Sequence, residues 1–261
     1  RASASSSQKV ARVDTSIALA DVPWALYFSN PVALTCIINA WNFGWINFMM
    51  LSEMPAYLSH ELGFDLESSA ILSVVPYIAM FVTVVTFAAI VECLQFRYDW
   101  STRAVRHCAM LVAFGGSSSF LLLASYTDDV YRAFTYVSLS QASLGAIQSG
   151  LSCSYIEITP NFAPILNAVC NTFTGLGGFI SPIFVAFMLE SFGDHAWHMV
   201  FLYTALQSAV ALALWVTFFR GEVIKELDQP WEKSKESKNA RSHRSEIQPL
   251  SPGASGSTKT A

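Results

Sequence analysis

Six stretches of the sequence are apolar over about 20 residues each, and they constrain the fold more than any other feature. A helix of about 20 residues crosses the roughly 30 Å hydrocarbon core of a bilayer. Only 13% of the 261 residues are charged, against about 25% in an ordinary soluble domain. We therefore predict an all-α integral membrane protein with six transmembrane helices. Their windows are 32–52, 71–91, 107–125, 133–154, 165–189 and 198–219.

Both ends of the chain differ from this apolar part, because they are polar and rich in Ser, Lys and Glu. We expect disordered tails at 1–22 and 224–261, on either side of a six-helix bundle at 23–223. No apolar segment followed by a small-residue cleavage site precedes the first span, so no signal peptide is expected. The first residue is Arg1, and we expect the chain to be part of a longer one.

The basic residues are distributed unevenly among the connectors. With six spans and both tails on one side, fourteen of the fifteen Lys and Arg residues fall on that side, and only Arg132 falls on the other. Positively charged segments of membrane proteins stay in the cytoplasm. The sequence thus predicts that both termini are cytoplasmic, and it leaves open whether the membrane is the plasma membrane or an organelle membrane.

Polar residues follow one face of the first span and one face of the fourth. At 100° per residue, the first set lies within a sector of about 140° and the second within about 100°. The first set is Asn39, Asn42, Phe43, Asn47, Met50 and Glu53, and the second is Ser138, Gln141, Gly145, Gln148, Ser149 and Ser152. An unpaired amide in hydrocarbon costs several kcal/mol, so each face must meet another helix or a water-filled cavity.

We interpret the two faces as the lining of a cavity, because they recur at the first member of each successive set of three spans. Transporters with a three-plus-three repeat hold their substrate near the bilayer midplane in this way. Interhelical hydrogen bonding is the alternative for any single Asn or Gln. One six-helix bundle alone does not enclose a site, so a partner bundle is expected.

Several other residues have a structural and a functional interpretation. Gly177 and Gly178 in the fifth span favour close helix packing or gating over a phosphate loop, because no strand precedes them. Glu53 could carry a proton during transport, or it could be a wetted interfacial carboxylate. Glu92 could pair with Arg97, Arg103 or Arg106 and latch one conformation, or these could be solvated loop charges.

The pattern of reactive side chains does not indicate an enzyme. The five cysteines are far apart and form no CxxC pair, and His195 and His198 form a lone HxxH in a short connector. We therefore expect no catalytic residues, no metal and no cofactor. The net charge of −4 also argues against a surface that neutralises nucleic acid.

Six ordered strings resemble, in order and spacing, the second half of the anion:cation symporters of the major facilitator superfamily. This family includes sialin, the vesicular glutamate transporters and plastid-type phosphate and ascorbate carriers. The resemblance covers residues 22–223. The strings are DVPWALYFSNPVAL, INAWNFGWINFMMLSEMPAYL, ESSAILSVVPY, STRAVRH, SGLSCSYIEITPNFAPILNAVCNT and WHMVFLYTALQSAVALALWVTFFRGEV.

The resemblance implies twelve spans in the whole protein, of which these six would be the seventh to twelfth, and a missing first half that supplies most of the charged residues. The sequence also departs from the family pattern at several positions. Phe43 stands where vesicular glutamate transporters place an arginine, which disfavours glutamate as the substrate. The family string Asn-His-Leu-Asp reads Ser154, Tyr155, Ile156 and Glu157 here, which removes a titratable histidine.

From the residues and the resemblance together, we predict a secondary active transporter that moves a small organic or inorganic anion by alternating access. Its expected partners are the anion, H⁺ or Na⁺, the lipid bilayer and an N-terminal six-helix half, and membrane potential is an alternative driving force. A six-span scaffold or receptor without transport is the rival hypothesis. The expected substrate-binding residues are Asn39, Asn42, Phe43, Asn47, Gln141, Gln148 and Asn171. The expected coupling or gating residues are Glu53, Glu92, Arg106, Gly177 and Gly178.

Overall fold

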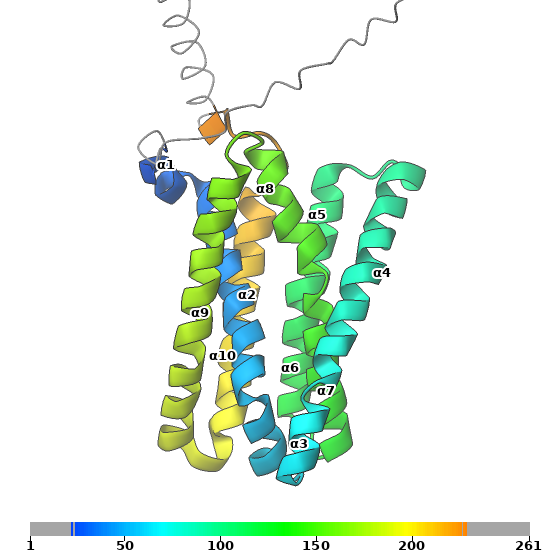
Figure 1. The fold of residues 1–261 in the computed structure, drawn as a ribbon, viewed down its shortest axis with the longest axis vertical. Coiled ribbons are helices and arrows are strands. Elements are labelled where there is room, and N and C mark those ends of the chain that lie inside the picture. The colour runs from blue at the N-terminus through cyan, green and yellow to red at the C-terminus, as the bar shows by residue number, and fades with distance from the viewer. Residues whose placement is uncertain (1–21, 23, 226, 229–261) are drawn as a thin grey trace, which may run out of the picture.

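The computed structural model describes residues 22, 24–225 and 227–228, and all regular structure among them is helical. The long helices lie side by side along one axis (Figure 1). Both ends of the described chain lie at the same end of this bundle, which we call the tail end and which also contains the connectors 99–101 and 159–162. The opposite end, with the connectors 62–65 and 126–129, is called the far end.

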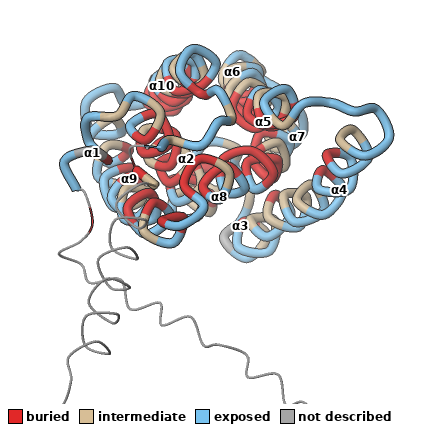
Figure 2. Tube along the Cα trace, turned by 90° about the horizontal axis from the view of Figure 1, so that it is seen from above, coloured by how far each residue is buried: buried red, intermediate tan, exposed pale blue. Residues whose placement is uncertain are grey.

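Helix α2 (Pro31–Ala56) occupies the middle of the bundle and follows the short α1 (Trp24–Ser29). Asn30 starts it, because its side-chain oxygen accepts a hydrogen bond from the backbone nitrogen of Val32 at 2.9 Å. Of the most apolar stretch of this span, 61% is buried, against 17% for the span that contains α4. Figure 2 shows the same contrast between a buried centre and an exposed α4. Helices α9 and α10 pack against α2 most extensively, and α7 and η4 also contact it.

The remaining elements include three short π-helical segments, η2, η3 and η4, and one 3₁₀ turn, η5. Side-chain oxygens of Asp65, Ser101 and Asp129 start helices by accepting a hydrogen bond from the backbone nitrogen three residues later. In chain order the elements are η2 (Tyr57–Glu61), α3 (Leu66–Leu72), α4 (Val75–Tyr98), α5 (Thr102–Met110), η3 (Leu111–Gly116), α6 (Ser117–Ser125), α7 (Val130–Leu144), η4 (Gln148–Ser152), α8 (Cys153–Ile158), α9 (Ala163–Phe192), η5 (Gly193–His195) and α10 (Ala196–Phe218).

Five helical stretches in the described part of the chain are long and apolar enough to cross a membrane. They correspond to five of the six predicted spans, and the prediction of a multi-pass, all-α integral membrane protein is confirmed. The stretches are Pro31–Glu61, Glu67–Tyr98, Thr102–Ser125, Ala163–Phe192 and Ala196–Phe218.

The predicted count of six spans is not confirmed by these criteria, because the fourth predicted span, 133–154, is not continuous. A turn at Gly145 and Ala146 divides it into α7 and a second piece formed by η4 and α8. The two pieces together still extend from the far end to the tail end (Figure 1). A Cβ atom at Gly145 would lie 2.6 Å from the carbonyl oxygen of Met80, so the turn brings this segment into close contact with α4.

Most of the predicted tails, at 1–22 and 224–261, lie outside the described residues. The packed part of the chain continues past the expected boundary at 223, however, because Leu227 is fully buried and Ile224 packs against the same core. The backbone nitrogen of Ile224 donates to the carbonyl oxygen of Ile158 at 2.8 Å. Asp228 accepts hydrogen bonds at 2.9 Å from the backbone and side-chain nitrogens of Asn161. The chain after α10 is thus fixed to the connector between α8 and α9.

Candidate functional site

The predicted polar face of α2 divides between two neighbours. Asn39 and Asn42 are fully buried and face α10. The amide nitrogen of Asn39 donates to the carbonyl oxygen of Ala211 at 3.2 Å, and the amide oxygen of Asn42 accepts from the amide of Gln207 at 3.0 Å. These two residues therefore join α2 to α10, which is the alternative interpretation considered above. They line neither of the two cavities that are described below. Their predicted role in substrate binding has no support in this arrangement and stays a prediction.

Replacing Asn42 with leucine is expected to lower the stability of the bundle by about 1–2 kcal/mol. The reason is that Gln207 and Ser208 would each lose a buried hydrogen-bond partner. Thermal unfolding of the purified full-length protein measures the effect. Gln148→Leu is the matched control, because the Gln148 side chain is exposed and its removal leaves no buried partner. Equal losses in the two variants would contradict this assignment.

Asn47 and Gln141 bring the two predicted polar faces into direct contact. The amide nitrogen of Gln141 donates to the side-chain oxygen of Asn47 at 2.9 Å, which connects α2 to α7. The hydroxyl of Tyr77 in α4 donates to the backbone oxygen of Asn47 at 3.3 Å. This contact joins three helices, and it also contributes bonds within the bundle rather than to an open cavity.

A cavity of about 210 Å³ lies where α2, η4, α8 and α9 meet. Three of the predicted substrate-binding residues are brought together in its wall, Phe43 from α2, Gln148 from η4 and Asn171 from α9. None of the nine described residues that line it is charged. The complete lining is Phe43, Ile147, Gln148, Leu151, Ser152, Tyr155, Asn167, Asn171 and Thr174.

A second cavity of about 360 Å³ adjoins the first between α8 and α9. The two cavities share Ser152, Tyr155 and Asn167, and the second extends to Ala163 and Pro164 at the start of α9. The shared residues make them parts of one groove, which we call the α8–α9 groove. It extends toward the tail end of the bundle, where α9 begins.

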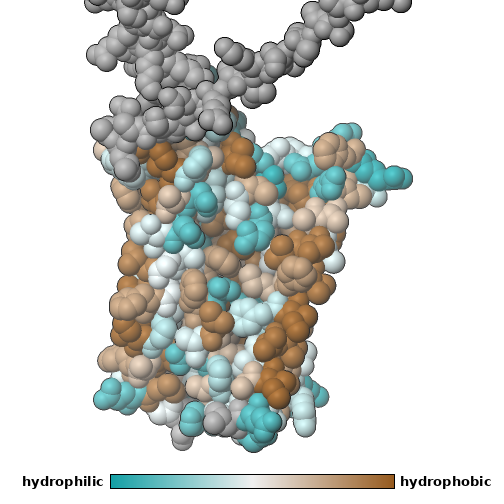
Figure 3. Space-filling model, in the orientation of Figure 1, coloured by the Kyte–Doolittle hydropathy of each residue, from teal (hydrophilic) through white to brown (hydrophobic). Residues whose placement is uncertain are grey.

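The face that contains this groove is polar along its middle and apolar along both sides. In Figure 3, the polar colours follow the centre of the face, over α2 and α8, between brown flanks over α9 and α4. Exposed apolar side chains account for the flanks. They include Leu176, Phe179, Ile183 and Phe187 on α9, and Ile78, Phe81, Val82 and Val85 on α4.

Arg106 fixes the wall of the groove from inside the bundle. It is 7% exposed, and its guanidinium forms an ion pair with Glu157 of α8, with an Nη2 to Oε1 distance of 2.6 Å. Its Nη1 also donates to the backbone oxygen of Ser149 in η4. The same guanidinium therefore holds α8 and the π-helical turn that displays Gln148 and Ser152. Of the three basic partners predicted for Glu92, Arg106 is therefore engaged with Glu157 instead.

The predicted coupling and gating residues lie in several places. Gly177 and Gly178 lie where α9 touches α2, and a Cβ atom at Gly177 would be 2.6 Å from the carbonyl oxygen of Trp41. These glycines thus permit close helix packing. Glu53 is half-buried near the far end of α2, and Glu92 is exposed near the tail end of α4. The structure does not bring the two carboxylates together, and their coupling roles stay predictions.

Sequence reasoning missed three polar groups of the groove, Tyr155, Asn167 and Thr174. A signal was present for two of them, because residues 167, 171 and 174 have the i, i+4, i+7 spacing of one helix face. Tyr155 was considered only because it stands at the histidine position of the family string. Its place in the wall depends on the π-helical turn before α8, which the sequence pattern does not reveal.

The sequence of this chain is similar to the sequences of known transporters. Vesicular glutamate transporter 2 of Homo sapiens is 27% identical over 228 residues, which are 86% of this chain and 38% of that protein. Sialin of Ovis aries is 26% identical over 203 residues, which are 77% of this chain and 41% of that protein. The chain is a homologue of these transporters. An uncharacterized transporter of Caenorhabditis elegans is 29% identical over 214 residues, which are 81% of this chain and 42% of that protein. No family model matches the chain.

These homologues confirm the resemblance to the anion:cation symporters of the major facilitator superfamily. The chain spans about two fifths of the length of the curated relatives it matches, which is consistent with a C-terminal half. The relatives are transporters and not enzymes, as expected from the sequence.

Proposed function

We propose that this chain forms the C-terminal half of a secondary active transporter that moves a small organic or inorganic anion by alternating access. In this proposal, the α8–α9 groove is half of the translocation path and an N-terminal six-helix half completes it. Transport is coupled to H⁺ or Na⁺ or driven by membrane potential. The kinship with transporters named for glutamate and with sialin supports an anionic substrate.

One observation carries the proposal: amide side chains are exposed within a membrane-length helix. Asn167 and Asn171 are both exposed on α9. Asn171 lies about 12 Å along the helix from Ala163, at 1.5 Å per residue. An amide facing lipid at that depth would cost several kcal/mol, so water or protein must cover this face. A partner bundle that encloses a wet path satisfies the requirement.

Because the lining of the groove is uncharged, we infer that each half of the transporter recognises a different part of the substrate. The amides and hydroxyls of the groove can donate hydrogen bonds to an anion without supplying a full positive charge. Arg106 is committed to Glu157 and Ser149, and the family resemblance implies that Phe43 stands where vesicular glutamate transporters place an arginine. We therefore assign the cation that neutralises the substrate to the N-terminal half, and we place both termini of this chain in the cytoplasm.

Uptake by the full-length protein in liposomes tests the groove. Gln148→Leu and Asn171→Leu should each lower the uptake of a transported anion at least tenfold, because each removes a hydrogen-bonding group from the wall. Thr217→Val is the matched control, since this exposed hydroxyl on α10 bonds only to its own helix, at the carbonyl oxygen of Ala213. Unchanged uptake in both leucine variants, with normal membrane insertion, would remove the groove from the path.

Thiol accessibility separates the transporter from the scaffold hypothesis. Single cysteines at positions 167 and 171 should react with a water-soluble thiol reagent, whereas a cysteine at position 39 should not, because Asn39 is fully buried. The exposed Cys93 and Cys153 are first replaced with serine to lower the background. If positions 167 and 171 were as unreactive as position 39, the face would be dry and the scaffold hypothesis would be favoured.

A further inference from the structure

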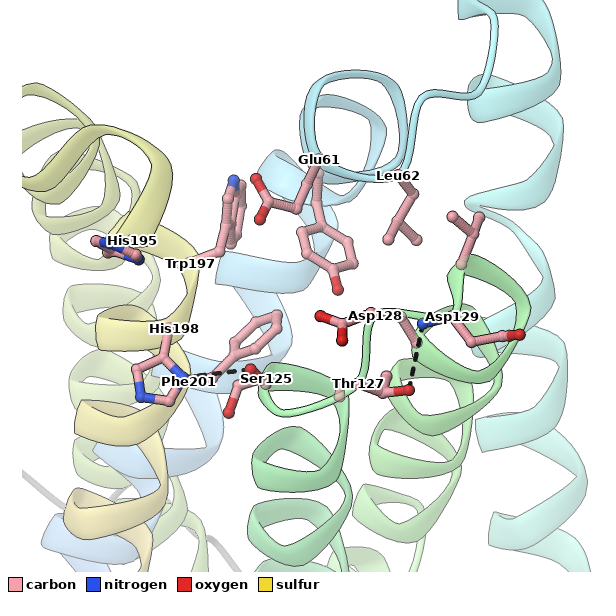
Figure 4. A pocket seen from close by; sticks show the side chains of 14 residues that line it. Glu61, Leu62, Ser125, Thr127, Asp128, Asp129, His195, Trp197, His198 and Phe201 are labelled. Carbon is pink, nitrogen blue, oxygen red and sulfur yellow. Dashed lines mark hydrogen bonds between the residues drawn. The ribbon is translucent and has the colours of Figure 1, made fainter.

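A third cavity, of about 410 Å³, lies at the far end of the bundle and shares no residue with the α8–α9 groove. It is bounded by η2, by the connector between α6 and α7, and by the start of α10 (Figure 4). Tyr57 in its wall is fourteen residues beyond Phe43 on the same helical stretch, or about 21 Å at 1.5 Å per residue. We call this space the far-end cavity. It lies outside the proposed translocation path.

Negative charge surrounds the far-end cavity. Glu61, Asp128 and Asp129 line it together with His195 and His198, and its described lining contains no lysine or arginine. The carboxylates of Glu61 and Asp128 project into the space between η2 and the α6–α7 connector (Figure 4). Asp129 has one oxygen engaged, since it accepts a hydrogen bond from the backbone nitrogen of Arg132 at 2.8 Å. A cation is therefore favoured here, and an anion is repelled.

Aromatic rings form the inner wall of the far-end cavity. The ring centroids of Tyr57 and Trp197 are 4.9 Å apart, and those of Tyr57 and Phe201 are 5.4 Å apart, both in edge-to-face geometry. The faces of tyrosine and tryptophan rings attract organic cations. Carboxylates beside aromatic rings are thus complementary to an ammonium group attached to a small apolar body.

Two hydrogen-bonding groups in this wall have no partner within the described part of the chain. Tyr57 and Trp197 are each 4% exposed, yet neither the hydroxyl nor the indole N–H forms a hydrogen bond there, and both side chains line the cavity. Buried tyrosine hydroxyls and tryptophan N–H groups usually find a partner. Both groups line the cavity and can donate to an oxygen atom, so they are available to a bound molecule that carries an oxygen acceptor.

We propose that the far-end cavity binds a small organic cation that carries an ammonium group and a nearby oxygen acceptor, as an amino alcohol does. The ammonium group lies against the rings, on the side of the cavity that the carboxylate of Asp128 lines. The oxygen accepts a hydrogen bond from Tyr57 or Trp197. A volume of about 410 Å³ is within the range of small-molecule sites and accommodates such a compound. This site does not depend on the transport of an anion.

Three matched compounds test the proposed chemistry on the full-length protein in lipid nanodiscs. They are 2-amino-1-phenylethanol with both groups, 2-phenylethylamine with the ammonium group alone, and 1-phenylethane-1,2-diol with oxygens alone. Titration calorimetry should give the tightest binding for the amino alcohol, weaker binding for the amine, and at least tenfold weaker binding for the diol. Equal affinities, or no binding of any compound, would overturn the proposal and leave a cavity that holds only water.

Three substitutions and one control locate the site. Asp128→Asn should weaken the binding of the amino alcohol at least tenfold, because the exposed carboxylate is lost without disturbing the core. Tyr57→Phe and Trp197→Phe keep an aromatic ring but remove a hydrogen-bond donor. Each should weaken the binding of the amino alcohol more than that of the amine, because the amine has no oxygen to accept the hydrogen bond. Glu67→Gln is the control, since this carboxylate is exposed at the far end and does not line the cavity. If the control weakened binding as much as Asp128→Asn, the effect would be one of general surface charge, and the site would be refuted.

Discussion

Replacing Arg106 with leucine is expected to lower the free energy of unfolding by roughly 3 kcal/mol, the lower end of the range for breaking a buried ion pair. The lower end applies because the side chain of Glu157 keeps 23% of its exposure, so water offsets part of the loss. The backbone oxygen of Ser149 loses its charged donor as well. Thermal or denaturant unfolding of the purified full-length protein measures the change.

Two further variants distinguish the effect of losing the ion pair from the effect of losing side-chain packing. The double variant with leucine at both Arg106 and Glu157 should recover part of the stability, because no unpaired charge is left. Arg106→Lys keeps the charge but not the forked geometry, and it should fall between the parent and the leucine variant. A double variant that is as unstable as the sum of the two single variants would show that the pair contributes nothing of its own.

The Arg106→Lys substitution should also change the kinetics of transport. Arg106 does not line the α8–α9 groove, but it holds the turn that displays Gln148 and Ser152. We therefore expect Arg106→Lys to raise the KM for the anion more than it lowers the maximum rate of uptake, as loss of positioning would. A fall in the maximum rate at constant KM would instead favour a direct role in the conformational cycle.

Placing a methyl group at Gly44 is expected to have a comparable effect on stability. The added Cβ atom would clash with the carbonyl group of Thr174 and lie 2.7 Å from its Cα atom. These are backbone atoms of α9, so no rotamer change relieves the contact and the two helices must separate. Gly44→Ala should therefore cost about 3 kcal/mol, at the upper end of the penalty for an overpacked core.

Gly175→Ala is a matched control for this prediction, because a Cβ atom there meets no heavy atom within 4 Å. It should leave the stability unchanged or raise it by about 0.5–1 kcal/mol, as alanine favours the helix over glycine. The comparison uses the same unfolding assay. If the two alanine variants had equal stability, the close approach of α2 and α9 at Gly44 would not exist in the membrane.

Hydropathy alone predicted most of the fold, and five of the six expected spans match membrane-length helices. The fourth span was harder to define because it is interrupted at Gly145, where the contact with α4 sets the backbone path. Periodicity also placed Phe43 and Gln148 on faces that do meet in one cavity, which Asn171, a residue named from the family resemblance, lines as well. Periodicity could not show that Asn42 faces α10 rather than the cavity. Adjacent residues such as Asn42 and Phe43 point only 100° apart around a helix, so one polar face can contact two neighbouring helices.

The far-end cavity illustrates the same limit for residues that are distant in the chain. Tyr57, Asp128 and Trp197 come from three separate segments, and no local pattern links them. Their meeting depends on how the ends of α2, α6 and α10 pack. The aromatic contacts that close the inner wall form only after that packing.

The sequence by itself determined that this chain lives in a membrane, which of its helices are polar, and where its positive charge gathers. These properties follow from residue type and local spacing. The free energy of transfer into lipid determines which stretches span the membrane, and helical periodicity determines which residues share a face. Only the tertiary structure decided that Arg106 pairs with Glu157, 51 residues away, rather than with Glu92, which is nearer in sequence. Helix packing sets which side chains lie within hydrogen-bond distance, and the cost of a buried unpaired charge then selects the partner.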